Sequence, residues 1–143
     1  MKEFEIKKII VPIIVAISLF AGFYFGYEYV TEPKIVDGVV SKNIDDEGNP
    51  TEITKTFSPE DSVHFSAKQN RFWIKKAQIV WYKGEIKTEN RLFVEKEVSV
   101  NEAGYFSTKL ADLEGLEEGR YGVTIYVDGK EVMETKAVFD VKQ

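Results

Sequence analysis

A long uncharged segment near the N-terminus constrains this chain more than any other feature. The nineteen residues from Ile9 to Tyr27 carry no charged side chain, in a chain of 143 residues. A helix rises about 1.5 Å per residue, so a segment of this length covers roughly the 30 Å hydrocarbon core of a bilayer. We therefore expect residues 9–29 to form a single transmembrane helix, with the remainder of the chain held at a membrane surface.

The segment is expected to be an uncleaved signal anchor rather than a signal peptide. A signal peptide has an apolar core of about 7–15 residues and a small-residue cleavage site, whereas this segment ends in the bulky sequence FYFGY at residues 23–27. Three lysines lie in residues 1–8, and only Lys34 follows the segment closely. This bias predicts a cytoplasmic N-terminus and an extracytoplasmic C-terminal domain, either periplasmic or extracellular.

Small residues recur along one face of the predicted span. Ser18, Gly22 and Gly26 are spaced four residues apart, so they would share one stripe of a helix. Such a stripe lets two helix backbones approach closely within a membrane. The stripe predicts helix packing, either with a second copy or with a partner subunit. The alternative, that glycine is simply common in transmembrane helices, stays open.

Composition excludes several classes of function for the rest of the chain. Beyond residue 32 there are 16 basic and 20 acidic residues, which argues against a nucleic-acid partner because phosphate neutralisation needs a basic surface. There is no Cys and one His, so thiolate and His-rich metal sites are not expected. The acidic sequence Asp45–Asn49 lacks the spacing of a calcium loop, and a solvated turn is favoured over a Ca²⁺ site, which stays open.

Residues 51–143 show the period-two alternation of short strands separated by turn residues. Residues 30–50 are expected to form a stalk, a first strand near Val36–Lys42 and a loop. The further predicted strands are Thr51–Phe57, Ser62–Lys68, Lys75–Tyr82, Arg91–Val100, Gly104–Leu110, Arg120–Val127 and Lys130–Val141. Asp128-Gly129 predicts a two-residue hairpin between the last two. Seven or eight antiparallel strands with apolar inner faces indicate an all-β sandwich.

Two details of this pattern resemble a known superfamily. Leu116, Gly119 and Tyr121 have the spacing of a tyrosine corner, in which the Tyr hydroxyl bonds to upstream backbone, and Trp81 occupies the middle of a strand. The segment resembles the immunoglobulin/fibronectin type III-like β-sandwiches. The resemblance implies an adhesive, scaffolding or accessory module rather than an enzyme. It extends only to a superfold, which hosts many unrelated functions.

No sequence motif for catalysis or cofactor binding is present. There is no nucleophile elbow, zinc-protease motif, P-loop or dinucleotide fingerprint. The only histidine, His64, is predicted on the solvent face of its strand with Ser62 and Ser66. We therefore expect no catalytic, cofactor-binding or metal-binding residues, and no enzymatic activity.

An aromatic and basic cluster is the leading candidate for a contact site in the domain. Arg71, Phe72, Trp73, Lys75 and Lys76 precede the strand that contains Trp81. Successive side chains of an extended chain point in opposite directions, so one of the two aromatics is expected at the surface. A loop that covers the end of the sandwich, kept soluble by its lysines, is favoured for this cluster. As a contact site, the cluster would suit an anionic partner, a glycan or lipid headgroups.

These expectations favour a non-enzymatic, single-pass accessory or structural subunit of an envelope membrane protein complex. Its transmembrane helix and its sandwich would both contact protein partners. The alternative is a cell-surface or periplasmic module that binds glycan or peptide through the aromatic cluster. A pilin-like filament subunit is less favoured because no prepilin processing site is recognisable before the span.

Overall fold

The computed structural model describes residues 11–23, 32–110 and 115–143 and divides the chain into two units, Met1–Glu32 and Pro33–Gln143. In the first unit, residues 11–23 are helical and carry no charged side chain. Among the described residues, no helix is both long enough and apolar enough to cross a membrane. Residues 1–10 and 24–31, which include the predicted cytoplasmic segment and Gly26, lie outside the described part.

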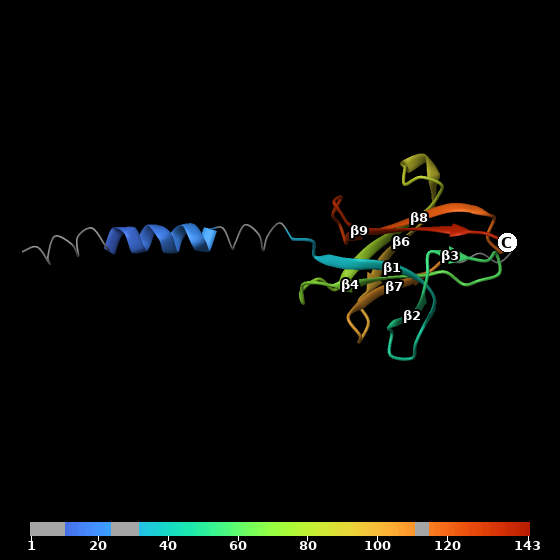
Figure 1. Ribbon diagram of the computed structural model, residues 1–143, viewed down its shortest axis with the longest axis horizontal. Coiled ribbons are helices and arrows are strands. Elements are labelled where there is room, and N and C mark those ends of the chain that lie inside the picture. Colours follow the sequence, from blue (N-terminus) through green and yellow to red (C-terminus); the bar gives the residue numbers. More distant parts are fainter. Residues whose placement is uncertain (1–10, 24–31, 111–114) are drawn as a thin grey trace, which may run out of the picture. The chain divides into compact units, whose positions relative to one another are not determined.

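The second unit contains nine strands and one 3₁₀ turn within its described residues (Figure 1). The elements are β1 (Ile35–Ile44), β2 (Pro50–Ile53), β3 (Thr56–Phe57), β4 (His64–Gln69), β5 (Lys76–Lys83), η1 (Thr88–Asn90), β6 (Arg91–Ser99), β7 (Tyr105–Lys109), β8 (Gly119–Val127) and β9 (Met133–Val141). The prediction of an all-β domain is confirmed.

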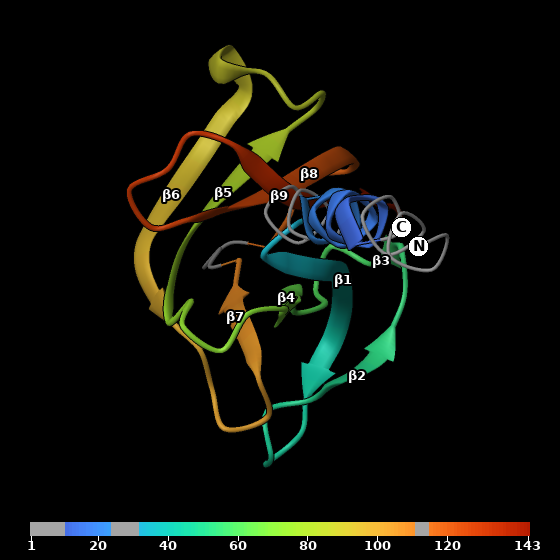
Figure 2. The same ribbon diagram turned by 90° about the vertical axis from the view of Figure 1, so that its left-hand side faces the viewer.

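The strands form two sheets, which Figure 2 shows as separate layers. One has the order β2-β1-β4-β7 and the other the order β3-β9-β8-β5-β6. The connection that carries η1 projects beyond the second sheet (Figures 1 and 2). The strand β1 belongs to the first sheet through antiparallel pairing with β4, so the compact unit begins before residue 51.

Aromatic side chains from both sheets fill the space between them. Trp81 is fully buried and makes edge-to-face contacts with Phe65 and Phe139, at ring-centroid distances of 6.4 and 6.1 Å. Tyr121 stacks on Phe139 at 5.3 Å. The alternation predicted from the sequence is confirmed for these inward positions, because each lies on the apolar face of its strand.

Three details of the predicted strands are wrong. The segment Thr51–Phe57 is two strands, because the chain leaves the first sheet after Ile53 and joins the second as β3. The pairing of β3 with β9 is parallel, so the sandwich is not wholly antiparallel. Ser66 does not face solvent. It is fully buried between β1 and β7, and its hydroxyl lies 2.9 Å from that of Ser107.

The predicted hairpin between the last two strands is present, since β8 and β9 pair antiparallel, but its connection is longer than the two residues Asp128-Gly129. Lys130 N–H donates to the carbonyl of Val127 at 2.9 Å, but β9 begins at Met133, later than predicted. A two-residue type I′ hairpin needs positive φ at both central residues. Gly129 has φ +77°, whereas Asp128 does not have positive φ. The turn is therefore not a two-residue type I′ turn.

Candidate functional site

Phe72 and Trp73 form an exposed pair of aromatic rings between β4 and β5, which we call the aromatic knob. Phe72 is 77% exposed and Trp73 is 45% exposed. Their rings meet edge to face, with centroids 5.1 Å apart and an interplanar angle of 90°. Both rings lie outside the core, where the sequence predicted only one at the surface.

A turn explains why both aromatics point outward. Ile74 N–H donates to the carbonyl of Arg71 at 3.1 Å, so the chain is not extended here. Ile74 takes the inward position and is 9% exposed. The Gln69 side-chain amide donates to the carbonyls of Phe72 at 3.3 Å and Ile74 at 2.7 Å. These bonds hold the knob on a fixed backbone, which lowers the ordering cost of binding.

The cations of the predicted cluster have two different roles. Arg71 is only 9% exposed, and its Nη1 donates to the carbonyl of Asn70 at 2.8 Å. Its guanidinium therefore belongs to the support of the loop rather than to the open surface. Lys75 and Lys76 are exposed. The surface next to the knob is thus basic through these two lysines.

The same loop is attached to the beginning of the domain. Asn70 N–H donates to the carbonyl of Lys34 at 2.9 Å, and its side-chain amide donates to the carbonyl of Pro33 at 2.7 Å. Lys34 N–H in turn donates to Oε2 of Glu134 at 2.8 Å. The aromatic knob therefore lies at the end of the sandwich where the chain enters it.

The predicted helix stripe is described only in part. The Ser18 hydroxyl donates to the carbonyl of Ile14 at 3.0 Å, which satisfies it within its own helix. A Cβ added at Gly22 would meet no atom within 4 Å. Gly26, the third member of the stripe, lies outside the described residues. Ser18 and Gly22 thus present an open face of this helix segment.

The residues of the predicted tyrosine corner lie together. Leu116 is buried, Gly119 has φ +140°, and Tyr121 is 3% exposed. The Tyr121 hydroxyl donates to the carbonyl of Glu117 at 2.7 Å. This bond anchors the connection that enters β8 to the edge of the core. These residues support the fold.

His64 and the acidic loop are structural elements of the first sheet. Burial, followed by the charge of Lys109, lowers the pKa of His64, which is half-buried rather than fully exposed. Asp45 Oδ1 accepts the N–H groups of Glu47 at 3.0 Å and Asn49 at 2.9 Å, as in a capped turn. Within the described ranges, no group of three or more His, Cys, Asp or Glu side chains is arranged to hold a metal ion.

Two tyrosines on the outer face of the second sheet form a cluster that strand alternation only partly indicated. Tyr82 lies on the face opposite the core and yet is only 3% exposed. Burial would raise the pKa of its hydroxyl, but contacts with Thr124, Tyr126 and Arg91 outweigh burial and lower it. Burial raises the pKa of Tyr126. A hollow of about 270 Å³ adjoins this cluster, at Arg91 and Tyr126.

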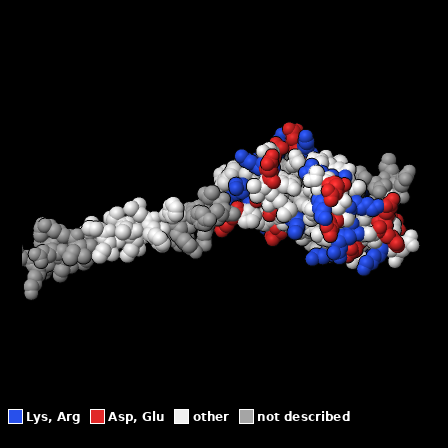
Figure 3. All heavy atoms as spheres, turned by 90° about the horizontal axis from the view of Figure 1, so that it is seen from above, with Lys and Arg blue, Asp and Glu red and all other residues white. Residues whose placement is uncertain are grey.

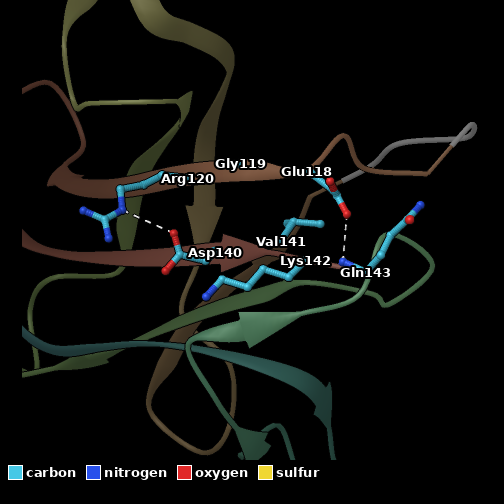
Figure 4. A pocket seen from close by; sticks show the side chains of 7 residues that line it. All are labelled: Glu118, Gly119, Arg120, Asp140, Val141, Lys142 and Gln143. Carbon is cyan, nitrogen blue, oxygen red and sulfur yellow. Dashed lines mark hydrogen bonds and ion pairs between the residues drawn. The ribbon is translucent and has the colours of Figure 1, made fainter.

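A second hollow, of about 350 Å³, lies at the ends of β8 and β9 (Figure 4). The side chains of Glu118, Arg120 and Asp140 in its lining are engaged in hydrogen bonds. Arg120 Nε donates to Asp140 Oδ1 at 3.3 Å, and Gln143 N–H donates to Glu118 Oε1 at 2.9 Å. In Figure 3 basic and acidic side chains alternate over the visible face of the sandwich. This surface shows no single-sign field of the kind that attracts a polyanion.

No protein-family model matches the sequence, and neither does any curated protein sequence. Among solved structures, the soluble domain of PmoD from Methylocystis sp. matches with 10% identity and a TM-score of 0.47, over 76% of this chain and 90% of that one. The Pseudomonas fluorescens alkylpurine DNA glycosylase AlkC, bound to DNA containing an abasic site analog, matches with 15% identity and a TM-score of 0.36. That match covers 77% of this chain and 30% of the glycosylase chain. At these scores neither likeness bears on function.

Proposed function

We propose that this chain is a non-enzymatic, membrane-anchored accessory subunit of an envelope membrane protein complex. In this proposal residues 9–29 are a signal anchor, the N-terminus is cytoplasmic, and residues 33–143 form an extracytoplasmic, immunoglobulin-like interaction domain. The aromatic knob contacts a protein partner, and the stripe of Ser18, Gly22 and Gly26 packs against a transmembrane helix.

The aromatic knob is the observation that carries the proposal. Two adjacent aromatic rings with 77% and 45% exposure are held on a hydrogen-bonded turn. Aromatic residues dominate binding energy at protein interfaces, because they bury a large area at low entropic cost. The adjacent Lys75 and Lys76 favour an interface with acidic groups at its rim.

The position of the knob favours a partner close to the membrane. The knob loop is bonded to Pro33 and Lys34, where the domain begins. Only three residues separate Pro33 from Tyr29, the last residue of the predicted span. A protein that contacts the knob would therefore lie near the membrane surface, as another subunit of a membrane complex does.

The strand order supports the immunoglobulin-like assignment. The neighbours β9, β8, β5 and β6 follow the G-F-C-C′ order of a variable-type sheet. Trp81 lies on β5, the strand in the C position, and Tyr121 lies near the start of β8, in the F position. An immunoglobulin-like sandwich without a disulfide is consistent with a chain that contains no Cys.

The proposal is tested by site-specific photo-crosslinking in the native membrane. The photoreactive residue p-benzoylphenylalanine replaces Phe72 in one sample and Val132 in the other, since Val132 is a matched apolar control at 73% exposure. We expect one or a few membrane-protein adducts from position 72 that are absent from position 132. Equal adducts from both positions, or none from position 72, would contradict a partner at the knob.

A second experiment tests the helix stripe. The double variant Gly22→Ile and Gly26→Ile fills the stripe with branched side chains, and Phe20→Ile is the control on the opposite face of the helix. We expect the double variant to lose partners that co-purify in mild detergent and the control to retain them. Retention of all partners by the double variant would remove the stripe from the proposal.

The exposed Trp73 also favours a second candidate, a surface module that binds glycans by stacking. That function predicts a chain that purifies without membrane partners and binds a glycan array through Trp73. Binding that survives Trp73→Ala would exclude it.

A further inference from the structure

The strand β9 has an edge that is open over most of its length. On one side β9 pairs with β8 from Met133 to Val141. On the other side, β3 pairs only with Asp140 and Val141. Among the described residues, the part of β9 before Asp140 therefore has no strand partner on this side.

The backbone groups of the open edge face outward from the sheet. Asp140 N–H donates to the carbonyl of Lys55 at 2.8 Å, so the backbone of Asp140 points to the β3 side. Alternate residues of a strand point their N–H and C=O groups to the same side. Val138 and Lys136 therefore direct theirs to the open edge, where the described residues provide no backbone hydrogen bond. These four groups form a template for another strand.

An apolar groove of about 240 Å³ lies beside this edge, between β1 and β9. Its apolar lining comes from Val39, Val40, Ile53, Ala137 and Val138. Ile53 is 60% exposed and Val138 is 37% exposed, so side chains that a partner would cover are in contact with solvent. The volume is below the roughly 300–1,000 Å³ of small-molecule sites. It suits an apolar side chain of a polypeptide better than a whole metabolite.

Two lysines give the groove a positive rim. Lys55 and Lys136 line it, and both are exposed. Neither has a carboxylate partner within 4 Å among the described residues. A second copy of this chain joined edge to edge at β9 would bring like charges together, which disfavours self-pairing. The rim instead matches a chain with acidic side chains.

We propose that this groove binds an extended, acidic segment of a partner protein, which adds to β9 as a further strand. The segment bonds to the backbone of Lys136 and Val138, places apolar side chains in the groove, and places carboxylates at Lys55 and Lys136. Main-chain bonds supply affinity and the pocket supplies selectivity, as in other cases of strand addition. The aromatic knob plays no part in this site. Failure of one proposal therefore leaves the other unaffected.

The probe is a blocked, fluorescein-labelled heptapeptide of alternating valine and glutamate, added to the full chain in mild detergent and followed by fluorescence anisotropy. Val138→Pro removes one open-edge N–H and keeps the pairing with β8, since proline is tolerated where an edge N–H is unpaired. Lys55→Glu with Lys136→Glu reverses the rim charge. Lys96→Glu, at an exposed position on β6, is the matched charge control.

We expect the wild type and Lys96→Glu to bind the peptide equally, with at least tenfold weaker binding by Val138→Pro and by the double lysine variant. A peptide with lysine in place of glutamate should not bind. We also expect hydrogen exchange at the amides of Lys136 and Val138 to slow when the peptide is bound. Absent binding to the wild type, equal binding to all variants, or unchanged exchange at these amides would overturn the proposal.

Discussion

The hydroxyl group of Tyr121 donates a 2.7 Å hydrogen bond to the carbonyl oxygen of Glu117, four residues earlier in the chain. The ring of the same tyrosine stacks on Phe139, with an interplanar angle of 9°. One side chain thus joins the loop before β8 to the aromatic core. The loop approach to β8 is therefore coupled to the packing of β9.

The substitution Tyr121→Phe tests how much the hydrogen bond to the Glu117 carbonyl stabilises the domain. We expect Tyr121→Phe to lower the free energy of unfolding by about 0.5–1.5 kcal/mol, the net value of one hydrogen bond, since the ring stacking is retained. Urea denaturation in mild detergent measures the change. Tyr105→Phe is the control, because no hydrogen bond of the Tyr105 hydroxyl is present among the described residues. Equal stability of Tyr121→Phe and the wild type would show that solvent replaces the bond without cost.

The backbone at Gly119 provides an independent test of the same corner. Gly119 has φ +140°, a conformation that L side chains rarely adopt, and an added Cβ would meet no atom within 4 Å. We expect Gly119→Ala to destabilise the domain by about 1–3 kcal/mol through backbone strain alone. Denaturation of Gly119→Ala and Tyr121→Phe, singly and together, measures their coupling. A neutral Gly119→Ala would mean that the strand start relaxes without strain.

The sequence predicted the strands well because burial on one face imposes a period of two. Val63, Phe65 and Ala67 are buried as the alternation required. The split of Thr51–Phe57 was not predictable in this way, since both halves alternate normally and only the sheet they join differs. The inward position of Ile74 was likewise missed. The chain turns at Arg71, so successive side chains there do not point to opposite faces as they do in a strand.

The candidate sites differ in how far they could be predicted. The knob was found because its two aromatics are adjacent in sequence. The groove beside β9 combines Val39, Ile53 and Val138, which come from three separate strands. No spacing in the chain links these positions. The open edge depends on where β3 stops pairing, which only the assembled sheet shows.

The stability of the domain depends on pH through Glu95, and the direction of its pKa shift gives the direction of this dependence. Burial raises the pKa of Glu95 in the folded state, and its carboxylate accepts a hydrogen bond from the Thr108 hydroxyl across the two sheets. The folded state therefore binds the proton more tightly than the unfolded state. Its contribution to stability is full below the unfolded pKa, which is close to the usual value of 4.5, and is lost as the pH rises through the folded pKa.

Glu95→Gln keeps an acceptor for Thr108 but removes this titration. We expect the stability of the variant relative to wild type to rise between pH 4 and pH 7. The change should be well below the roughly 1.4 kcal/mol that one pKa unit represents, because solvent screens a partly exposed carboxylate. Urea denaturation across this range measures it, and the titration of His64 cancels because both proteins contain it. If the stability of Glu95→Gln relative to wild type fell as the pH rose, the raised pKa of Glu95 would be contradicted.

The two tryptophans should respond in opposite ways to solvent and to substitution. Trp73 is 45% exposed, whereas Trp81 is fully buried and contacts two phenylalanine rings. We expect acrylamide to quench the fluorescence of Trp73 and to leave that of Trp81 largely unaffected, so Trp73→Phe should remove the quenchable fraction with little change in stability. Trp81→Phe should cost about 1–3 kcal/mol, less than the roughly 3–5 kcal/mol of truncation to alanine.

The Nε1–H of the buried Trp81 indole has no hydrogen-bond partner in the part of the chain that the structure describes. Replacement by phenylalanine therefore loses packing volume and no hydrogen bond, and it also removes the desolvation cost of an unpaired donor. Urea denaturation of both variants, with quenching measured on the same samples, separates the two residues. A Trp81→Phe loss above that of Trp81→Ala would contradict a cost set by volume, and quenching that persists in Trp73→Phe would contradict the burial of Trp81.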